Sequence, residues 1–389
     1  MARLLPLSYN KDKDHQIKRI DGSTIGENQL DKKIKLLIHE ANVTGLAIAI
    51  FNDNQIAYQK AFGYSNAETK DTLDVNHVFY GASLSKSVFG YLMAQLVVEN
   101  KIDLDKPINS YFDVELPEIS IDKAFRKLND LKDDEHYKQI TARMCLSHTT
   151  GFPNWRWINN PDNRLKIQFE PGTNYSYSGE GIMLSQWLVE HVTKKELEDL
   201  AKEMIFMPLQ MNNTDYLRRN EFKEPFCYGH SIKQKKLPKK IETEDAAAAG
   251  SMETTLVDYS KFLEHILKLY SEDSEITQNM FNPNVRIKSK AQFGPLAKEE
   301  TNENDIIELS YGLGWGLLKS DYGIGAFKEG HSEGFQHYSI LFPEKNIGVL
   351  ILSNSDNAES IFKELLEVSI GDIYTPWKWE NYIPYNLER

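Results

Sequence analysis

The sequence predicts an α+β fold in which one antiparallel sheet, flanked by helices, is built from both ends of the chain. Three observations predict it: a strand pair near the beginning, a group of strand-like runs near the end, and helical periodicity between them. We expect the sheet to come from about residues 29–80 and 271–371, with a mainly helical region inserted at about residues 81–270. A functional site is expected where this region meets the sheet.

The strands are indicated by runs of β-branched and aromatic residues with turn-prone breaks. The run "VTGLAIAIFNDNQIAYQKAFGY" predicts strands at about 45–51 and 55–62, joined by the Asn-Asp-Asn turn at 52–54. The runs "YGLGWGLLKS", "GAFKEGHSEG", "QHYSILFP" and "NIGVLILSN" predict four more strands, and an amphipathic helix follows at about 358–370. A hairpin near the beginning and a meander near the end can therefore share one sheet.

The middle of the chain shows apolar residues at helical spacing, for example in "GIMLSQWLVEHVTKKELEDLAKEMIF" and "TLVDYSKFLEHILKLY". No linker rich in Pro, Gly or Ser and no repeat divides the 389 residues. We expect one domain at 29–371, preceded by an N-terminal extension at 1–28 and followed by an aromatic C-terminal tail at 372–389. We interpret this tail as packing back onto its own domain; a contact in a homodimer is the alternative.

Composition and charge exclude several classes of function. Asp and Glu outnumber Lys and Arg by 57 to 45, and no basic stripe is interleaved with aromatic residues, so nucleic acid is not an expected partner. Cys145 and Cys227 lie at neither disulfide-framework nor zinc spacing. No apolar run reaches the roughly 18 residues of a membrane span. The first residues show no signal h-region, and the compartment stays open.

The pattern Ser-x-x-Lys occurs four times, and one occurrence stands apart. The occurrences that begin at Ser8, Ser120 and Ser360 lie in polar or charged surroundings. Ser83 and Lys86, in contrast, begin some fifteen mostly apolar residues with helical spacing, so Lys86 is expected to be buried. A buried lysine needs a partner or a chemical role.

A serine one helical turn before a buried lysine is suited to nucleophilic catalysis. A serine hydroxyl is a weak nucleophile until a base takes its proton, and burial can lower a lysine pKa enough to provide that base. The beginning of a helix adds N–H donors that stabilise an oxyanion near the serine. The pattern therefore predicts Ser83 as a nucleophile and Lys86 as its base.

Six stretches resemble, in order, the motifs of the serine β-lactamase and penicillin-binding-protein superfamily. They are "SLSK" at 83, "CLSHTTGFP" at 145, "FEPGTNYSYSGEG" at 169, "AAAAGSMETTLVDYSKFL" at 246, "YGLGWGL" at 311 and "GHSEGFQHY" at 330. The likeness is to class C β-lactamases, D,D-peptidases and family VIII carboxylesterases. It implies a β-lactamase/transpeptidase-like fold and, for a chain whose signal has been removed, an exported or periplasmic location.

The resemblance assigns a second motif, Tyr-x-Asn, to Tyr177-Ser178-Gly179. It implies that Tyr177 shares proton transfer with the lysine, as a phenol whose pKa neighbouring ammonium groups depress toward phenolate. Gly179 lacks the amide side chain that grips substrate in the family, and the competing register at Tyr175 supplies no asparagine either. His148 is interpreted as a structural, hydrogen-bonded histidine.

The third motif, Lys/His-Thr/Ser-Gly on a strand beside the cleft, is matched to His331-Ser332-Glu333. If His331 faces the cleft, the Glu333 carboxylate lies on the same side and repels anionic substrates. A bulge after Ser332 would instead turn Glu333 to solvent and place Gly334 in the role of the family's glycine. A metal site from His331, Glu333 and His337 is a weaker interpretation.

These assignments predict a serine hydrolase that forms an acyl-enzyme on Ser83, with Lys86 and Tyr177 as the proton-transfer pair. The expected partner is a small-molecule acyl substrate, with esters or other uncharged acyl donors preferred to β-lactams, and no metal or organic cofactor is required. A D-amino-acid peptidase or weak β-lactamase is the enzymatic alternative. A penicillin-binding or sensor protein with little turnover is the alternative from another class.

Overall fold

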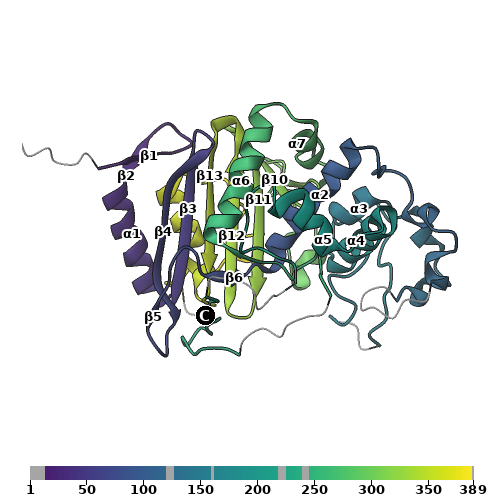
Figure 1. Ribbon diagram of the computed structural model, residues 1–389, viewed down its shortest axis with the longest axis horizontal. Helices are drawn as coiled ribbons and strands as arrows, with labels where there is room; N and C mark the ends of the chain where they lie inside the picture. Colours follow the sequence, from purple (N-terminus) through teal and green to yellow (C-terminus); the bar gives the residue numbers. More distant parts are fainter. Residues whose placement is uncertain (1–13, 120–126, 159–161, 218–224, 239–244, 388–389) are drawn as a thin grey trace, which may run out of the picture.

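The computed structural model describes residues 14–119, 127–158, 162–217, 225–238 and 245–387. A nine-stranded antiparallel sheet runs through it in the order β5-β4-β3-β13-β12-β11-β10-β9-β8 (Figure 1). The strands are β3 (Gly45–Asn52), β4 (Gln55–Asn66), β5 (Asp71–Thr72), β8 (Val285–Arg286), β9 (Ser310–Tyr311), β10 (Gly316–Ser320), β11 (Gly323–Ser332), β12 (Phe335–Phe342) and β13 (Ile347–Ser353). Because β3 pairs with β13, the prediction of one antiparallel sheet from both chain ends is confirmed.

The central strand β3 shows why the sheet is buried on both sides. Its apolar side chains alternate between two hydrophobic cores, with Ala47 and Ala49 in one and Leu46 and Ile48 in the other. The turn to β4 uses consecutive Asp and Asn residues with positive φ, the conformation that a tight hairpin requires. A short apolar run thus becomes a strand covered on both faces.

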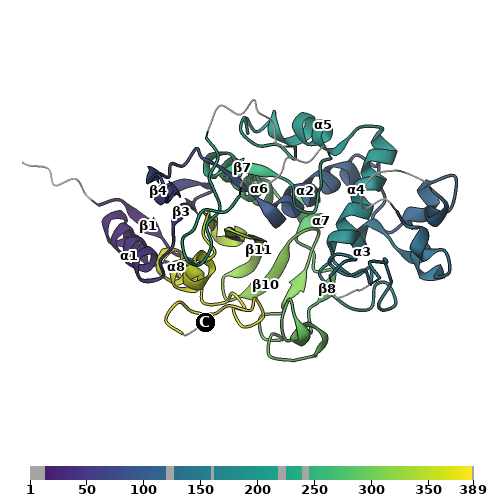
Figure 2. The ribbon, with the colours of Figure 1, turned by 90° about the horizontal axis from the view of Figure 1, so that it is seen from below.

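Helices cover the two faces of the sheet separately (Figure 2). On one side lie α1 (Glu27–Glu40) and α8 (Phe362–Ser369), whose buried residues join the core that contains Leu46. On the other side lie α2 (Ser85–Val98) and α6 (Leu256–Ser271), and α6 contacts β3 and β13. The remaining helices are α3 (Ala142–Leu146), α4 (Gly179–Thr193), α5 (Leu197–Ala201) and α7 (Glu275–Met280).

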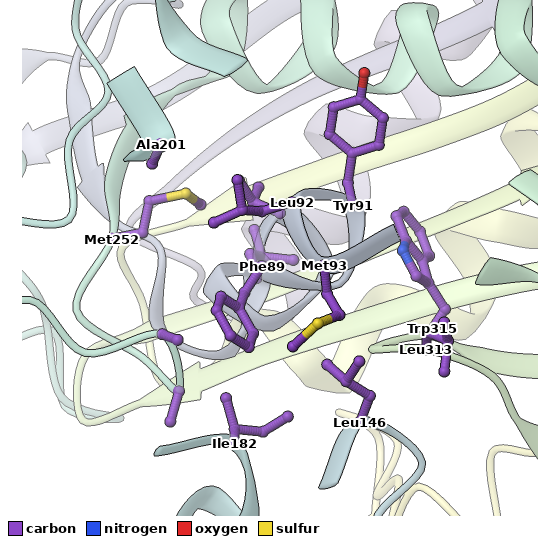
Figure 3. Packing of buried hydrophobic residues seen from close by; sticks show 14 of the residues in the cluster. Phe89, Tyr91, Leu92, Met93, Leu146, Ile182, Ala201, Met252, Leu313 and Trp315 are labelled. Atoms are coloured by element: carbon purple, nitrogen blue, oxygen red, sulfur yellow. The ribbon is translucent and has the colours of Figure 1, made fainter. Parts of the chain in front are cut away.

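Helix α2 is buried around most of its circumference, which fixes the position of its first turn. Figure 3 shows Phe89 and Met93 of α2 surrounded by apolar side chains from other elements, among them Leu146 of α3 and Ile182 of α4. Gly90 allows the backbone at Leu313 to approach closely, since a Cβ there would lie 2.3 Å from the Leu313 carbonyl oxygen. A rigid helix therefore holds the residues that begin it.

Both ends of the chain pack against the domain. Strands β1 (Gln16–Lys18) and β2 (Thr24–Gly26), which we assigned to an extension, form a hairpin whose Ile17 and Ile25 join the α1 core. The C-terminal tail also returns to the domain, where Trp379 is 1% exposed. A further strand pair, β6 (Val78–Tyr80) and β7 (Glu253–Thr255), precedes α2 and α6. Among the described helices, none has the length and apolarity needed to cross a membrane.

Candidate active site

Ser83 lies in a short 3-10 turn, Ala82–Leu84, that leads from β6 into α2. Ala82 has φ +47, a conformation unfavourable for residues with a Cβ. The Ser85 hydroxyl holds this turn because it donates to the Ala82 carbonyl at 2.6 Å and accepts from the Met252 N–H at 3.1 Å. Neighbouring structure thus fixes a half-buried Ser83 at the edge of a pocket.

Lys86 lies one turn further along α2 and is 1% exposed. Its Nζ is 2.9 Å from Ser83 Oγ and donates to the Ala249 carbonyl at 2.5 Å. Burial, followed by the positive charge of Lys328, lowers the Lys86 pKa well below its usual value. The shift favours the free amine, which is within reach of the Ser83 proton.

Tyr177 lies just before α4, between two lysines. Its ring centre is 4.9 Å from Lys86 Nζ and 5.1 Å from Lys328 Nζ, and its hydroxyl accepts from Lys328 at 3.3 Å. Burial raises the Tyr177 pKa to about 12, although Lys328 and the Ser83 hydroxyl act in the opposite direction. The expectation that neighbouring ammonium groups depress the Tyr177 pKa toward phenolate is therefore corrected: burial outweighs the Lys328 charge, and the Tyr177 pKa rises.

The cation beside Tyr177 is Lys328, in the middle of β11. It begins the triplet Lys328-Glu329-Gly330, which starts three residues before the triplet that we assigned to the third motif. Lys328 is fully buried, and its Nζ forms an ion pair with Glu329 at 2.7 Å. Burial lowers the Lys328 pKa, but Glu329 and Tyr177 outweigh it and the net shift is upward. The upward shift favours the ammonium form of Lys328. Lys328 thus takes the position of the third motif's first residue, to which we had matched His331.

The residues of the assigned third motif lie at the end of β11. The His331 side chain is 62% exposed, with Nδ1 3.7 Å from a Glu359 carboxylate oxygen. Ser332 pairs with the first residue of β12, so Glu333 lies exposed in the connecting turn and does not line the pocket. Gly334 is the other turn residue, with φ +78. The expectation that Glu333 stands beside the cleft is therefore corrected.

The pocket lies along a free edge of β11. Strand β10 pairs with β11 only as far as Phe327, so the following residues of β11 have no partner strand on that side among the described residues. Gly330 allows β11 to pass close to the nucleophile turn, since a Cβ there would lie 2.8 Å from the Gly81 carbonyl oxygen. The cavity has a volume of about 350 Å³, and Ser83, Lys86 and Tyr177 are among the residues that line it.

Comparison with known proteins identifies the family. The Beta-lactamase family model matches residues 30–368. The chain belongs to the Beta-lactamase family. It is 22% identical to Protein flp of Staphylococcus aureus strain N315 over 350 residues, which cover 84% of this chain and 63% of that protein. The chain thus spans less than two thirds of that relative.

Further comparisons agree with this membership. Penicillin-binding protein 4* of Bacillus subtilis is 24% identical over 370 residues, covering 86% of this chain and 74% of that protein. The octameric penicillin-binding protein homologue from Pyrococcus abyssi superposes with a TM-score of 0.69 at 20% identity, covering 91% and 79% of the two chains. The β-lactamase/transpeptidase-like fold is confirmed, and family membership supports a serine hydrolase-type function in general terms.

In this Beta-lactamase family member, Asn154 provides an amide side chain close to the tyrosine motif. A Cβ at Gly179 would lie 2.7 Å from the Trp155 ring, so position 179 has no space for an asparagine. Asn154 lines the pocket, and its Oδ1 accepts from the Gly179 N–H at 3.1 Å. Sequence reasoning missed Asn154, which closely follows the "CLSHTTGFP" stretch, and Gly179 is not a pocket-lining residue.

Two buried histidines near the site are held by hydrogen bonds. His148 is fully buried, accepts from the Ser178 N–H at 3.1 Å and lies 4.3 Å from the Tyr177 ring. His337 uses both ring nitrogens, in contacts with the Tyr80 carbonyl at 2.9 Å and the Ser353 N–H at 3.2 Å. Within the described ranges, no group of three His, Cys, Asp or Glu side chains is arranged to hold a metal.

The C-terminal tail forms part of the pocket wall, which sequence reasoning did not foresee. Trp377, Glu380 and Asn381 line the cavity, and the Trp377 ring packs 5.4 Å from the Tyr338 ring of β12. The aromatic spacing of the tail indicated packing, but no signal in it indicated which surface the tail covers.

Proposed function

We propose that this protein is a serine hydrolase that forms an acyl-enzyme on Ser83 and releases it to water. The observation that carries the proposal is the 2.9 Å separation of Ser83 Oγ from the Nζ of a buried lysine whose pKa is lowered. A nucleophile needs a nearby base that is unprotonated at working pH. Lys86 is adjacent to Ser83, and its pKa shifts in the direction that favours the unprotonated form.

Acylation begins when the Lys86 amine takes the hydroxyl proton as Ser83 Oγ attacks the substrate carbonyl carbon. The N–H of Ser83, at the beginning of α2, donates to the resulting oxyanion. We assign the second donor to the backbone N–H of His331, on the free edge of β11. When the bond to the leaving group breaks, Tyr177 donates a proton to that group and Lys86 reprotonates Tyr177.

Deacylation uses the same groups in reverse. The Lys86–Tyr177 pair takes a proton from water, which attacks the ester carbonyl, and Ser83 regains its proton as the acid leaves. Lys328 stays protonated throughout and orients the Tyr177 hydroxyl through the 3.3 Å hydrogen bond. The Asn154 amide is placed to hold the acyl group of the substrate.

The charge on β11 favours uncharged acyl donors such as esters over anionic β-lactams. A carboxylate, Glu329, follows Lys328 where the resembled motif has a hydroxyl residue, and it lines the pocket. A substrate carboxylate near Glu329 would meet a like charge. Family resemblance keeps a D-amino-acid peptidase as the runner-up.

The test combines covalent labelling with turnover. The protein is incubated with a fluorophosphonate, a series of p-nitrophenyl esters and a chromogenic cephalosporin, and intact mass is followed in parallel. We expect an adduct on the peptide containing Ser83, absent in Ser83→Ala and present in Ser360→Ala, which removes a serine with the same spacing to a lysine. Labelling that persists in Ser83→Ala would overturn the proposal. A stable acyl adduct without turnover would identify a penicillin-binding or sensor protein instead.

A further inference from the structure

Three carboxylates line the pocket that contains Ser83. Glu329 of β11, Glu359 after β13 and Glu380 of the C-terminal tail all line it. Aromatic side chains from Tyr338 and Trp377 share this wall. Such a wall suits a group that is both positively charged and partly apolar.

Glu380 is the buried member of this set. It is 8% exposed, and its Oε1 atom is buried without a hydrogen-bond partner among the described residues. The backbone around it is fixed, because the Glu380 N–H donates to the Pro376 carbonyl at 3.0 Å and the Gln292 N–H donates to the Trp379 carbonyl at 2.8 Å. A buried acceptor on a fixed backbone is costly unless a donor reaches it.

Glu329 has a second carboxylate oxygen of this kind. Its Oε1 accepts from Lys328 at 2.7 Å and from the Gln292 amide at 2.9 Å. Its Oε2 is buried without a partner in the part of the chain that the structure describes. One oxygen of Glu329 is therefore bonded to Lys328 and Gln292, while the other has no donor among the described residues.

Among the described residues, the nearby cations form ion pairs with Glu329 and Glu359 and none with Glu380. Lys328 is already bonded to Glu329 and Tyr177, and the lowered pKa of Lys86 favours its neutral form. His331 is 3.7 Å from Glu359. Burial, Glu329 and Glu359 together raise the Glu380 pKa well above its usual value, so a cation placed beside Glu380 would restore its charge.

We propose that Glu329 and Glu380 form a subsite for a substrate ammonium group, so that the preferred acyl donors carry a positive charge. The proposal rests on the proposed hydrolase function and adds the substrate class to it. An ammonium supplies up to three N–H donors, and carboxylates accept them as charge-assisted hydrogen bonds. The C-terminal tail, by supplying Glu380, is then a specificity-determining segment of the enzyme.

Matched substrate pairs test the subsite. Hydrolysis of p-nitrophenyl 4-(aminomethyl)benzoate is compared with that of the 4-ethylbenzoate ester, which has a similar shape and no charge. A second pair, 4-(aminomethyl)phenyl acetate and 4-ethylphenyl acetate, places the charge on the leaving group. We expect kcat/KM to favour the charged member of one pair by about tenfold or more, and the pair that responds shows which side of the substrate reaches the carboxylates.

Glu380→Gln keeps the shape and removes the charge, so we expect the preference to fall to roughly twofold or less. Glu380→Asp retains a carboxylate and should preserve part of the preference, which separates lost charge from lost folding. The control is Glu367→Gln, a substitution on α8 of a half-exposed glutamate that does not line the pocket. It should leave the ratio unchanged.

Failure of the subsite is distinguishable from failure of the hydrolase. If the wild type hydrolyses neutral esters but shows no preference for charge in either pair, the subsite is overturned and the hydrolase stands. If no ester is turned over, calorimetric titration of Ser83→Ala with 4-methylbenzylammonium and with 4-methylbenzyl alcohol tests binding alone. Equal or absent binding of the two compounds overturns the subsite, and tighter binding of the ammonium that Glu380→Gln abolishes supports it.

Discussion

Two buried lysines face the same tyrosine from different elements, and their pKa values move in opposite directions. Lys86, at the beginning of α2, has burial and the Lys328 charge acting together, so its pKa falls. Lys328, on the free edge of β11, has a carboxylate at 2.7 Å, and its pKa rises despite burial. The difference teaches that the neighbouring charge, more than burial itself, decides which lysine serves as base and which as fixed cation.

The largest expected effect comes from removing the base. Lys86→Met keeps most of the side-chain volume but leaves Ser83 without a proton acceptor, so kcat/KM for a neutral ester should fall by about 10³. Stopped-flow acylation and the rate of fluorophosphonate labelling measure this loss.

Tyr177→Phe should lower kcat by roughly 10². Because the two residues act as one unit, the double variant should be little worse than Lys86→Met, and fully multiplicative losses would show separate roles.

The next effect is a pair of opposite shifts in pH dependence. Lys328→Met removes a cation that lowers the Lys86 pKa, so that pKa should rise and the acidic limb of the kcat/KM profile should move to higher pH. Glu329→Gln removes an anion that raises the Lys86 pKa, so the same limb should move to lower pH. Profiles measured from pH 5 to 10 with a neutral ester test both signs. Shifts in the same direction would contradict the opposing roles of the two residues.

The sequence predicted the α2 side of this comparison better than the β11 side. A serine and a lysine one turn apart before an apolar run define a local pattern, and residues at this spacing lie close together, with Ser83 Oγ 2.9 Å from Lys86 Nζ. The β11 motif depends on register, since Lys328 and His331 begin two similar triplets three residues apart. Two features of the folded protein show which triplet lies beside the nucleophile. The pairing of β10 with β11 ends at Phe327, and Lys328 contacts Tyr177.

Long-range contacts account for the other omissions. Asn154 and Glu380 reach the pocket from an irregular loop and from the tail, and neither lies in a periodic pattern that sequence reasoning can interpret. The centre of the sheet was predictable because strands such as β3 are apolar runs, and β3 is buried on both faces. The site was predictable only where local geometry determined it.

A smaller effect is expected from restoring the family's asparagine. In Gly179→Asn the new Cβ would overlap the Trp155 ring, so we expect a loss of stability of about 1–3 kcal/mol. Thermal unfolding followed by circular dichroism measures the change. The matched variant Asn154→Ala should leave stability closer to the wild type and instead raise KM for esters. Equal stability of Gly179→Asn and the wild type would show that the Trp155 ring moves aside.

The smallest effect is expected at Glu333, which lies in the turn after β11 and not on the free edge of the strand. Glu329 and Glu333 are four residues apart and chemically identical, but only Glu329 lines the pocket. Exposed Glu333 is screened by water and salt, so Glu333→Gln should change the ratio of kcat/KM for an anionic cephalosporin and a neutral ester by less than about twofold. Glu329→Gln should raise that ratio several-fold, because a like charge leaves the substrate path. Added salt should reduce the wild-type discrimination against the anionic substrate without changing the rank order of the two variants. A change in selectivity that is larger in Glu333→Gln than in Glu329→Gln would mean that the end of β11, and not its free edge, meets the substrate.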